Sequence, residues 1–167
     1  MKELTITTKA VLFGNDELPE EYRSLVEEAK RQTSHSYSPY SHFAVGAAAR
    51  LKDGTVIGGS NQENAAYPSG LCAERTTLFY ANSQYPDNPV TALAIACFTG
   101  GHFTAQPGTP CGSCRQVMVE LEHKAGVPMA VILYGSEQTC VFRSAEDLMP
   151  LSFFAEAMSG EGVGMNV

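Results

Sequence analysis

The sequence has little positive charge. Its 167 residues include 11 lysines and arginines against 18 aspartates and glutamates, a formal net charge of −7, and the basic residues form no cluster. A protein that binds nucleic acid through its phosphates needs a basic face, whereas this chain repels a polyanion at long range. The charge therefore argues against a nucleic-acid partner and favours a small, uncharged substrate.

Long apolar runs are also missing. No stretch approaches the roughly 18 apolar residues that a membrane helix needs, and the N-terminus lacks the apolar region and small-residue cleavage site of a secretory signal. We therefore expect a soluble, cytoplasmic protein without a membrane partner. The sequence shows no repeat, low-complexity tract or interdomain linker, so we expect one domain over residues 1–167, with 1–16 as an N-terminal extension and 159–167 as a flexible tail.

Hydrophobic periodicity predicts the helices. Leu18, Tyr22, Leu25, Val26 and Ala29 recur at the spacing of one helix face. Pro110 is expected to open a later helix, because its fixed φ suits a first helical turn. The expected helices lie near residues 18–29, over 71–82 and from 110 onward, with short helical segments near 144–148 and 151–158.

The strand pattern completes an α/β fold. Asp53-Gly54 is a hairpin signal between two expected strands. A near-continuous apolar run at 90–98 is typical of a strand covered on both faces. We predict a three-layer α/β/α domain with a mixed sheet of about five strands. The expected strands span residues 43–51, 55–60, 90–98, 127–134 and 139–142, and the N-terminal stretch is a candidate short strand.

The cysteines indicate a metal site. The chain has five cysteines, and an odd number cannot all pair in disulfides. This count favours metal binding or catalysis over a disulfide framework. Cys111 and Cys114 are related by i, i+3 at an expected helix start, so their sulfurs lie on one side. Cys72, at another helix start, is the candidate third ligand. Three ligands and one open position are typical of catalytic zinc, so we predict one Zn²⁺ per chain.

Two residues that follow Cys72 add chemistry. Glu74 shares the site only if the metal sits off the helix end, where Glu74 would move protons between water and substrate without being a ligand. Three thiolates with Zn²⁺ leave a formal charge of −1. Arg75 is the candidate to offset this charge by contacting the cysteine sulfurs, and a structure with Arg75 turned into solvent would reject that role.

The sequence resembles the cytidine deaminase family. The resemblance is carried by Cys72-Ala73-Glu74 together with Pro110-Cys111-Gly112-Ser113-Cys114, and it extends to residues 38–48, 61–68 and 111–116. It implies a cytidine deaminase-like fold and a homotetramer. It also implies hydrolysis of cytidine and 2′-deoxycytidine to uridine and 2′-deoxyuridine plus ammonia, as in pyrimidine salvage.

The resemblance further implies substrate contacts. Asn61 and Glu63 would hold the ribose hydroxyls, and they lie at i, i+2, which puts both on one face of a strand. Phe43 would form a wall of the pocket, and the Ala73 backbone would read the pyrimidine edge.

Some parts of the sequence fit the family less well. Tyr67 and Phe153 would act across a subunit interface, but Phe153 belongs to a short closing match far from the other motifs. The loop 100–106 and the tail beyond Phe153 depart from the family pattern. These differences affect the expected lid of the pocket and do not change the residues expected to bind zinc or transfer protons.

Two other functions remain open. The same zinc chemistry could act on a related aminonucleoside such as blasticidin S. Alternatively, the chain could be a non-catalytic structural zinc module in which Cys97 or Cys140 closes a four-cysteine site. The second alternative explains the cysteines but not Glu74.

Overall fold

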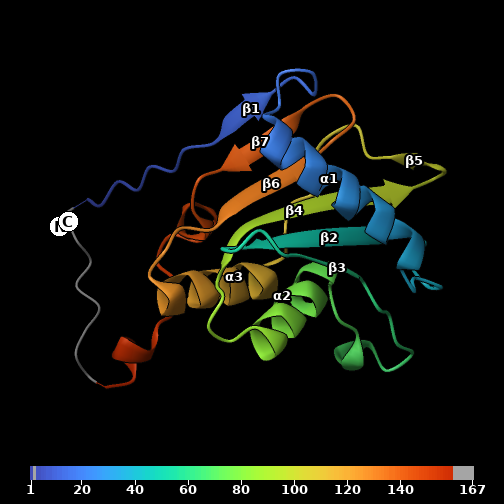
Figure 1. Ribbon diagram of the computed structural model, residues 1–167. Coiled ribbons are helices and arrows are strands. Elements are labelled where there is room, and N and C mark those ends of the chain that lie inside the picture. The colour runs from blue at the N-terminus through green and yellow to red at the C-terminus, as the bar shows by residue number, and fades with distance from the viewer. Residues whose placement is uncertain (2, 160–167) are drawn as a thin grey trace.

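A mixed β-sheet forms the middle layer of the fold, with one helix on one face and two on the other (Figure 1). The computed structural model describes residue 1 and residues 3–159. Because helices cover both faces of the sheet, the expected α/β/α layers are confirmed. The flexible tail expected at 159–167 lies, apart from Ser159, outside the described residues.

The helices are α1 (Glu20–Gln32), α2 (Ala73–Gln84) and α3 (Gly112–Ala125). Four single-turn 3₁₀ helices accompany them, η1 (Thr33–His35), η2 (Tyr67–Ser69), η3 (Ala145–Leu148) and η4 (Ala155–Ala157). The strands are β1 (Val11–Phe13), β2 (Ala44–Leu51), β3 (Val56–Ser60), β4 (Val90–Thr99), β5 (His102–Phe103), β6 (Ala130–Tyr134) and β7 (Thr139–Phe142). Among the described residues, no helix combines the length and apolar character needed to cross a membrane.

The sheet has the strand order β1-β7-β6-β4-β2-β3, and β5 pairs with β4 outside this path. Only the β4–β6 pair is parallel among the described pairings, so the sheet is mixed as expected. The prediction of about five strands was low, because the described sheet has seven. The two strands beyond the expected five are β1, which lies in the N-terminal stretch named as a candidate short strand, and β5. They have three and two residues and are too short to show a period of two. Gly100 and Gly101, at φ 60° and 85°, form the turn that brings β5 back onto β4.

The two faces of β4 explain its continuous apolar run. Successive side chains of a strand point to opposite faces. Large residues of β4 pack in the core under α2 and α3, whereas its alanines pack under α1. The two sets are Leu93, Ile95 and Cys97, and Ala92, Ala94 and Ala96. Small residues on the α1 side let that helix lie directly on the sheet.

Several helix boundaries differ from the sequence prediction. The helices expected near 18–29 and over 71–82 are α1 (Glu20–Gln32) and α2 (Ala73–Gln84). α3 begins at Gly112, so Pro110 precedes the N-cap residue Cys111 and does not open the helix. Cys111 has an extended backbone, with φ −67° and ψ 165°, which keeps it and Pro110 outside the helix. The helical segment expected at 151–158 is reduced to η4, and Leu151 adopts φ 63°, which a continuous right-handed helix excludes.

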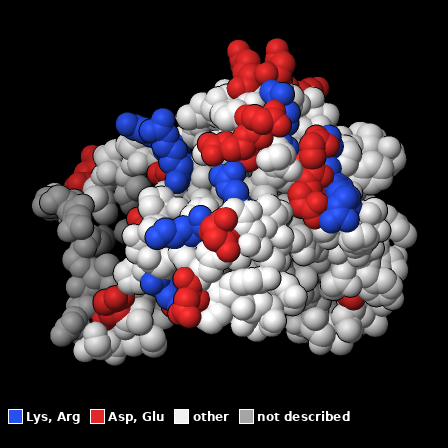
Figure 2. All heavy atoms as spheres, viewed as in Figure 1, with Lys and Arg blue, Asp and Glu red and all other residues white. Residues whose placement is uncertain are grey.

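Charged side chains are mixed in sign on the face shown in Figure 2, where basic residues lie beside acidic ones. On α1, Lys30 pairs with Glu27 at 2.7 Å and Arg31 pairs with Glu28 at 2.6 Å. These pairs are spaced i, i+3 along the helix, so solvent screens them and they contribute little to stability.

Candidate active site

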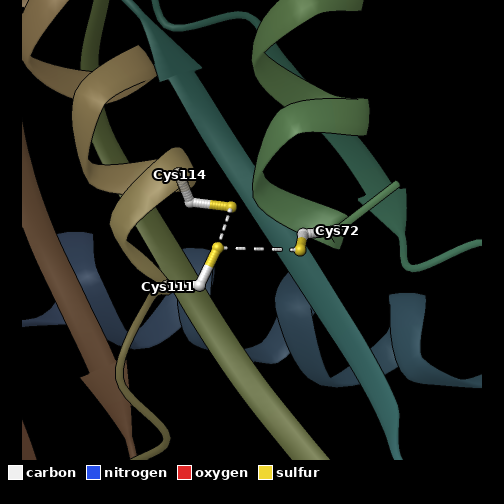
Figure 3. Close-up of side chains that lie close together, drawn as sticks. All are labelled: Cys72, Cys111 and Cys114. Atoms are coloured by element: carbon white, nitrogen blue, oxygen red, sulfur yellow. Dashed lines mark hydrogen bonds between the residues drawn. The ribbon is translucent and has the colours of Figure 1, made fainter. Parts of the chain in front are cut away.

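Three cysteine sulfurs meet between the N-terminal ends of α2 and α3 (Figure 3). The Sγ atoms of Cys72 and Cys111 lie 3.9 Å apart, those of Cys111 and Cys114 lie 3.4 Å apart, and all three lie within 4.8 Å of one another. Tetrahedral zinc with Zn–S bonds of 2.3 Å requires sulfurs about 3.8 Å apart. The sulfur triangle therefore fits zinc, which confirms the predicted cofactor.

The remaining described cysteines stand apart from this triangle. Cys97 is buried in β4 and Cys140 is half-buried in β7, and neither belongs to the metal-ligand group found among the described residues. All five cysteines are free thiols. The four-cysteine closure of a structural zinc module is thus not formed, and a fourth position is left for chemistry.

Two of the three cysteines lie at helix ends that favour negative charge. Cys72 and Cys111 are the N-cap residues of α2 and α3, where unpaired N–H groups and the helix dipole favour negative charge. A hydrogen bond with Cys114, followed by one from Arg75, lowers the pKa of Cys72 to about 5 despite partial burial. Cys72 is therefore a thiolate at neutral pH, the state that binds metal.

Arg75 turns toward the sulfurs. Its Nη2 atom lies 3.5 Å from Cys72 Sγ. The guanidinium therefore places a positive charge beside the thiolate at the start of α2. The hydrogen bond to Cys72 is the main reason that the pKa of Arg75 is raised above its ordinary value. The guanidinium is thus fully charged beside the ligand set.

Glu74 lies in the same site although it is two residues from Cys72. It is 5% exposed, and Cys72 on its own helix and Cys114 on the other helix lie near enough to influence the pKa of its carboxyl group. Burial is the main cause that raises the pKa of Glu74, and the negative charge of Cys72 adds to it. A raised pKa moves this carboxyl group toward the range in which it can both accept and return a proton, as a general acid and base must.

A cavity of about 530 Å³ opens beside Cys72 and Arg75. Its volume lies within the range of small-molecule sites, roughly 300–1,000 Å³. Three of the residues expected to contact substrate or a neighbouring subunit line it, namely Asn61, Glu63 and Tyr67. The structure therefore brings the sugar-binding candidates together with the cysteine site.

The polar residues of the cavity are fixed by the loops around them. Asn61 Oδ1 accepts a hydrogen bond from the Val45 amide at 2.8 Å, and its Nδ2 donates to the Phe43 carbonyl at 2.9 Å. Glu63 Oε2 accepts from the Tyr40 amide at 2.9 Å. A side-chain hydrogen bond from Ser41, then the Tyr40 amide, lowers the pKa of Glu63, so this carboxylate is ionised.

The other expected site residues do not line the cavity. Ala73 is fully buried as the first residue of α2, between the cysteine and Glu74. Phe43 is 37% exposed and touches the site through its backbone bond to Asn61. Phe153 is 58% exposed, and Tyr67, which does line the cavity, is 76% exposed, so both aromatic rings are free to contact another molecule.

Two polar residues of α3 carry contacts that the sequence did not predict. Arg115 donates from Nε to the Pro110 carbonyl at 2.9 Å and from Nη1 to the Leu148 carbonyl at 3.0 Å. Glu122 is 6% exposed and accepts the Ala145 amide at 2.9 Å. Their partners are mainly backbone groups, which leave no signature in the sequence.

Comparisons with known proteins agree with this chemistry. Residues 19–130 match the family model of the cytidine and deoxycytidylate deaminase zinc-binding region. A cytidine deaminase from Halalkalibacterium halodurans is 41% identical over 135 residues, which cover 81% of this chain and 96% of that protein. A cytidine deaminase from Sporosarcina psychrophila is 39% identical over 136 residues, covering 81% and 93%.

Solved structures give the same result. The crystal structure of a cytidine deaminase from Burkholderia pseudomallei aligns with a TM-score of 0.68 at 41% identity, covering 79% of this chain and 98% of that one. A cytidine deaminase from Mycobacterium tuberculosis aligns with a TM-score of 0.62 at 33% identity, covering 80% and 97%. The three-cysteine site, the matched region and these relatives confirm the resemblance, and the chain belongs to the cytidine deaminase family of zinc-binding hydrolases.

Proposed function

We propose that this protein hydrolyses cytidine and 2′-deoxycytidine to uridine and 2′-deoxyuridine with release of ammonia. The observation that carries the proposal is the contact of a buried carboxyl, Glu74, with a three-cysteine metal site that opens beside a nucleoside-sized cavity. A structural zinc site does not require a buried carboxyl group beside its cysteines. The acidic net charge of −7 also suits an uncharged nucleoside better than a nucleotide or tRNA.

The chain's own residues supply the proton transfers. Zinc held by Cys72, Cys111 and Cys114 supplies Lewis acidity that lowers the pKa of water. Glu74 accepts one proton of the attacking water and delivers it to N3 of the pyrimidine. The other proton leaves with the amino group as ammonia, so that C4 exchanges its C–N bond for a C–O bond. The raised pKa of Glu74 supports this shuttle.

The substrate is held on the cavity side of the cysteines. Asn61 and Glu63 would bind the ribose hydroxyls, since both line the cavity beside Cys72. Ala73 would present backbone groups to the pyrimidine edge, and Phe43, which is outside the cavity lining but bonded to Asn61, would extend one wall. Nothing in Asn61 or Glu63 requires a 2′-hydroxyl, so ribo- and deoxyribonucleosides are both expected substrates.

Arg75 would balance the charge of the metal site. Three thiolates and one Zn²⁺ carry a net charge of −1, which weakens the metal as a Lewis acid. The guanidinium 3.5 Å from Cys72 Sγ brings the site to neutrality. We assign Arg75 this role on the basis of its distance and orientation.

The assembly we propose is a homotetramer that serves pyrimidine salvage in the cytoplasm. Tyr67 and Phe153 would reach a neighbouring subunit, since each exposes more than half of its surface. The five free thiols suit a reducing compartment. Size-exclusion chromatography with light scattering would test the tetramer, because a monomer with full activity would reject any role for these two residues across an interface.

The test of the function is the loss of ultraviolet absorbance when purified zinc-loaded protein meets cytidine. Glu74→Gln should lower turnover by about 10²-fold or more, because its amide cannot shuttle a proton. Zinc content should stay at one ion per chain. Glu120→Gln, the same change at an exposed site on α3, is the matched control and should leave turnover unchanged.

Two outcomes would overturn the proposal. Near-full turnover of Glu74→Gln with zinc bound would remove the proton carrier. Inactivity of the zinc-loaded wild-type protein on both nucleosides would remove the substrate. A panel that measures ammonia release from cytidine, 2′-deoxycytidine and blasticidin S separates the nucleoside assignment from the related aminonucleoside.

A further inference from the structure

The C-terminal segment, residues 144–154, is held against α3 by three side chains of that helix. Glu122 accepts hydrogen bonds from the Ser144 hydroxyl at 2.5 Å and from the Ala145 amide at 2.9 Å. Further along, Arg115 donates to the Leu148 carbonyl at 3.0 Å, and Gln116 donates to the Phe153 carbonyl at 2.7 Å. From Ser144 to Leu148 the segment thus runs from the last turn of α3 toward the end that carries the cysteines.

Arg115 differs from the other two because it also binds the loop that leads to the metal site. Its Nε donates to the Pro110 carbonyl at 2.9 Å while Nη1 donates to Leu148. The guanidinium is planar and rigid, so the two carbonyls are held at a fixed separation. Displacement of one carbonyl therefore disturbs the contact with the other.

The Pro110 carbonyl matters because it belongs to the peptide that joins Pro110 to Cys111. Cys111 is the exposed member of the cysteine triad, whereas Cys72 is half-buried and Cys114 is buried. The helix that begins after Cys111 has no side-chain hydrogen bond at its N-cap, and Pro110 has no N–H to donate. Packing and capping therefore hold Cys111 weakly, and Arg115 provides a fixed contact at the residue before it.

We propose that Arg115 is a positioning residue that couples zinc binding to the order of the C-terminal segment. It holds the peptide before Cys111 in place while Leu148 anchors the opposite side of the guanidinium. The coupling acts in both directions, as linkage requires. Loss of the Arg115 contacts weakens zinc binding, and loss of zinc loosens the segment at Leu148. This inference rests on the cysteine site and not on the identity of the substrate.

Zinc release tests the first direction. The rate of zinc transfer from the loaded protein to a chromophoric chelator should rise about 10-fold or more in Arg115→Lys, because groups that orient metal ligands contribute roughly 10–100-fold to metal affinity. Lysine keeps the charge but has a single ammonium group that cannot span both carbonyls. Gln116→Ala is the matched control, since Gln116 is the next residue and binds the same segment without touching Pro110.

A stability control separates positioning from general loosening. Glu122→Gln weakens the start of the C-terminal segment and should lower the melting temperature, but it leaves the Arg115 contacts intact. Its zinc release should stay well below that of Arg115→Lys, because the Leu148 carbonyl keeps its hydrogen bond to Arg115. If Arg115→Lys is folded and releases zinc at the wild-type rate, or if Glu122→Gln releases zinc as fast as Arg115→Lys, the proposed role is wrong.

Hydrogen exchange in the wild-type protein tests the reverse direction without any variant. Removal of zinc should speed exchange of the Asp147 and Met149 amides, which bond to Ser144 and Glu146 in the η3 turn. The Ala145 amide, held by Glu122, should keep its protection. Unchanged exchange at Asp147 and Met149 would overturn the coupling. Neither measurement needs a substrate, so failure here is distinguishable from failure of the proposed deaminase activity.

Discussion

Gly108 offers a sharp test of how the loop before Cys111 is packed. A Cβ at Gly108 would lie 2.4 Å from Cys97 Sγ and 3.5 Å from Cys97 Cβ. Nonbonded heavy atoms prefer a separation of about 3.5–4.0 Å. Gly108→Ala must therefore move the loop or the β4 sulfur by about 1 Å. Gly108 has no positive φ, so the alanine itself is compatible with the backbone.

Removal of the Cys97 sulfur should relieve the close contact and restore part of the lost stability. Overpacking of this kind costs about 1–3 kcal/mol. Cys97→Ala removes one buried atom and costs about 1 kcal/mol, the scale of a buried methylene. In the double variant the nearest Cys97 atom is Cβ, at an ordinary contact distance of 3.5 Å. The double variant should therefore lose about 1 kcal/mol, less than the sum of the single losses.

Urea unfolding of the wild type, both single variants and the double variant measures the coupling. A favourable coupling of about 1–3 kcal/mol is expected for residues in contact. Zinc content should fall in Gly108→Ala and recover in the double variant. Gly112→Ala is the control, because nothing lies within 4 Å of its added Cβ. Additive losses in the double variant would refute the reasoning.

Three further predictions follow from other contacts. Gly46→Ala would place a Cβ 2.0 Å from the Ala29 carbonyl oxygen, so it should lower the free energy of unfolding by about 3 kcal/mol or more, and an unchanged urea midpoint would contradict this. Glu122→Ala leaves buried donors without an acceptor at about 1–3 kcal/mol each, and calorimetry should show a lower melting temperature than in Glu122→Gln. Hydrogen bonds lower the pKa of Glu63 from 4.5, so the hydrogen bond between its carboxylate and the Tyr40 amide is complete above pH 4.5 and is lost as pH falls through the lower pKa of the folded protein. The NMR shift of the Tyr40 amide should therefore titrate with a midpoint below 4.5. A midpoint at or above 4.5 would contradict the contact.

Much of the fold could be predicted from local patterns. Asp53-Gly54 marked the hairpin between β2 and β3, and Gly54 has the positive φ, 93°, that such a turn requires. The buried face of α1 appeared as a 3.6-residue period, with Leu25, Val26 and Ala29 buried as that period indicates. These features depend on neighbouring residues, so the sequence carries them directly.

Short elements and element ends could not be predicted in the same way. β5 has two residues and exists because the turn at Gly100 and Gly101 folds the chain onto β4. The start of α3 depends on the extended backbone of Cys111, which lies in the metal loop. Such positions are set by contacts with distant parts of the chain and not by local propensity.

The sequence by itself determined which residue types are present for chemistry and on which elements they lie. The i, i+3 spacing of Cys111 and Cys114 at an expected helix start already implied a shared ion. Tertiary structure alone decided that Cys72 completes their triangle, that Glu74 reaches Cys114 from the other helix, and that Arg115 joins Pro110 to Leu148. The physical reason is that these contacts join separate elements, and the Arg115 contacts end on backbone carbonyls. Every residue has a carbonyl, so only the folded chain shows which one is bound.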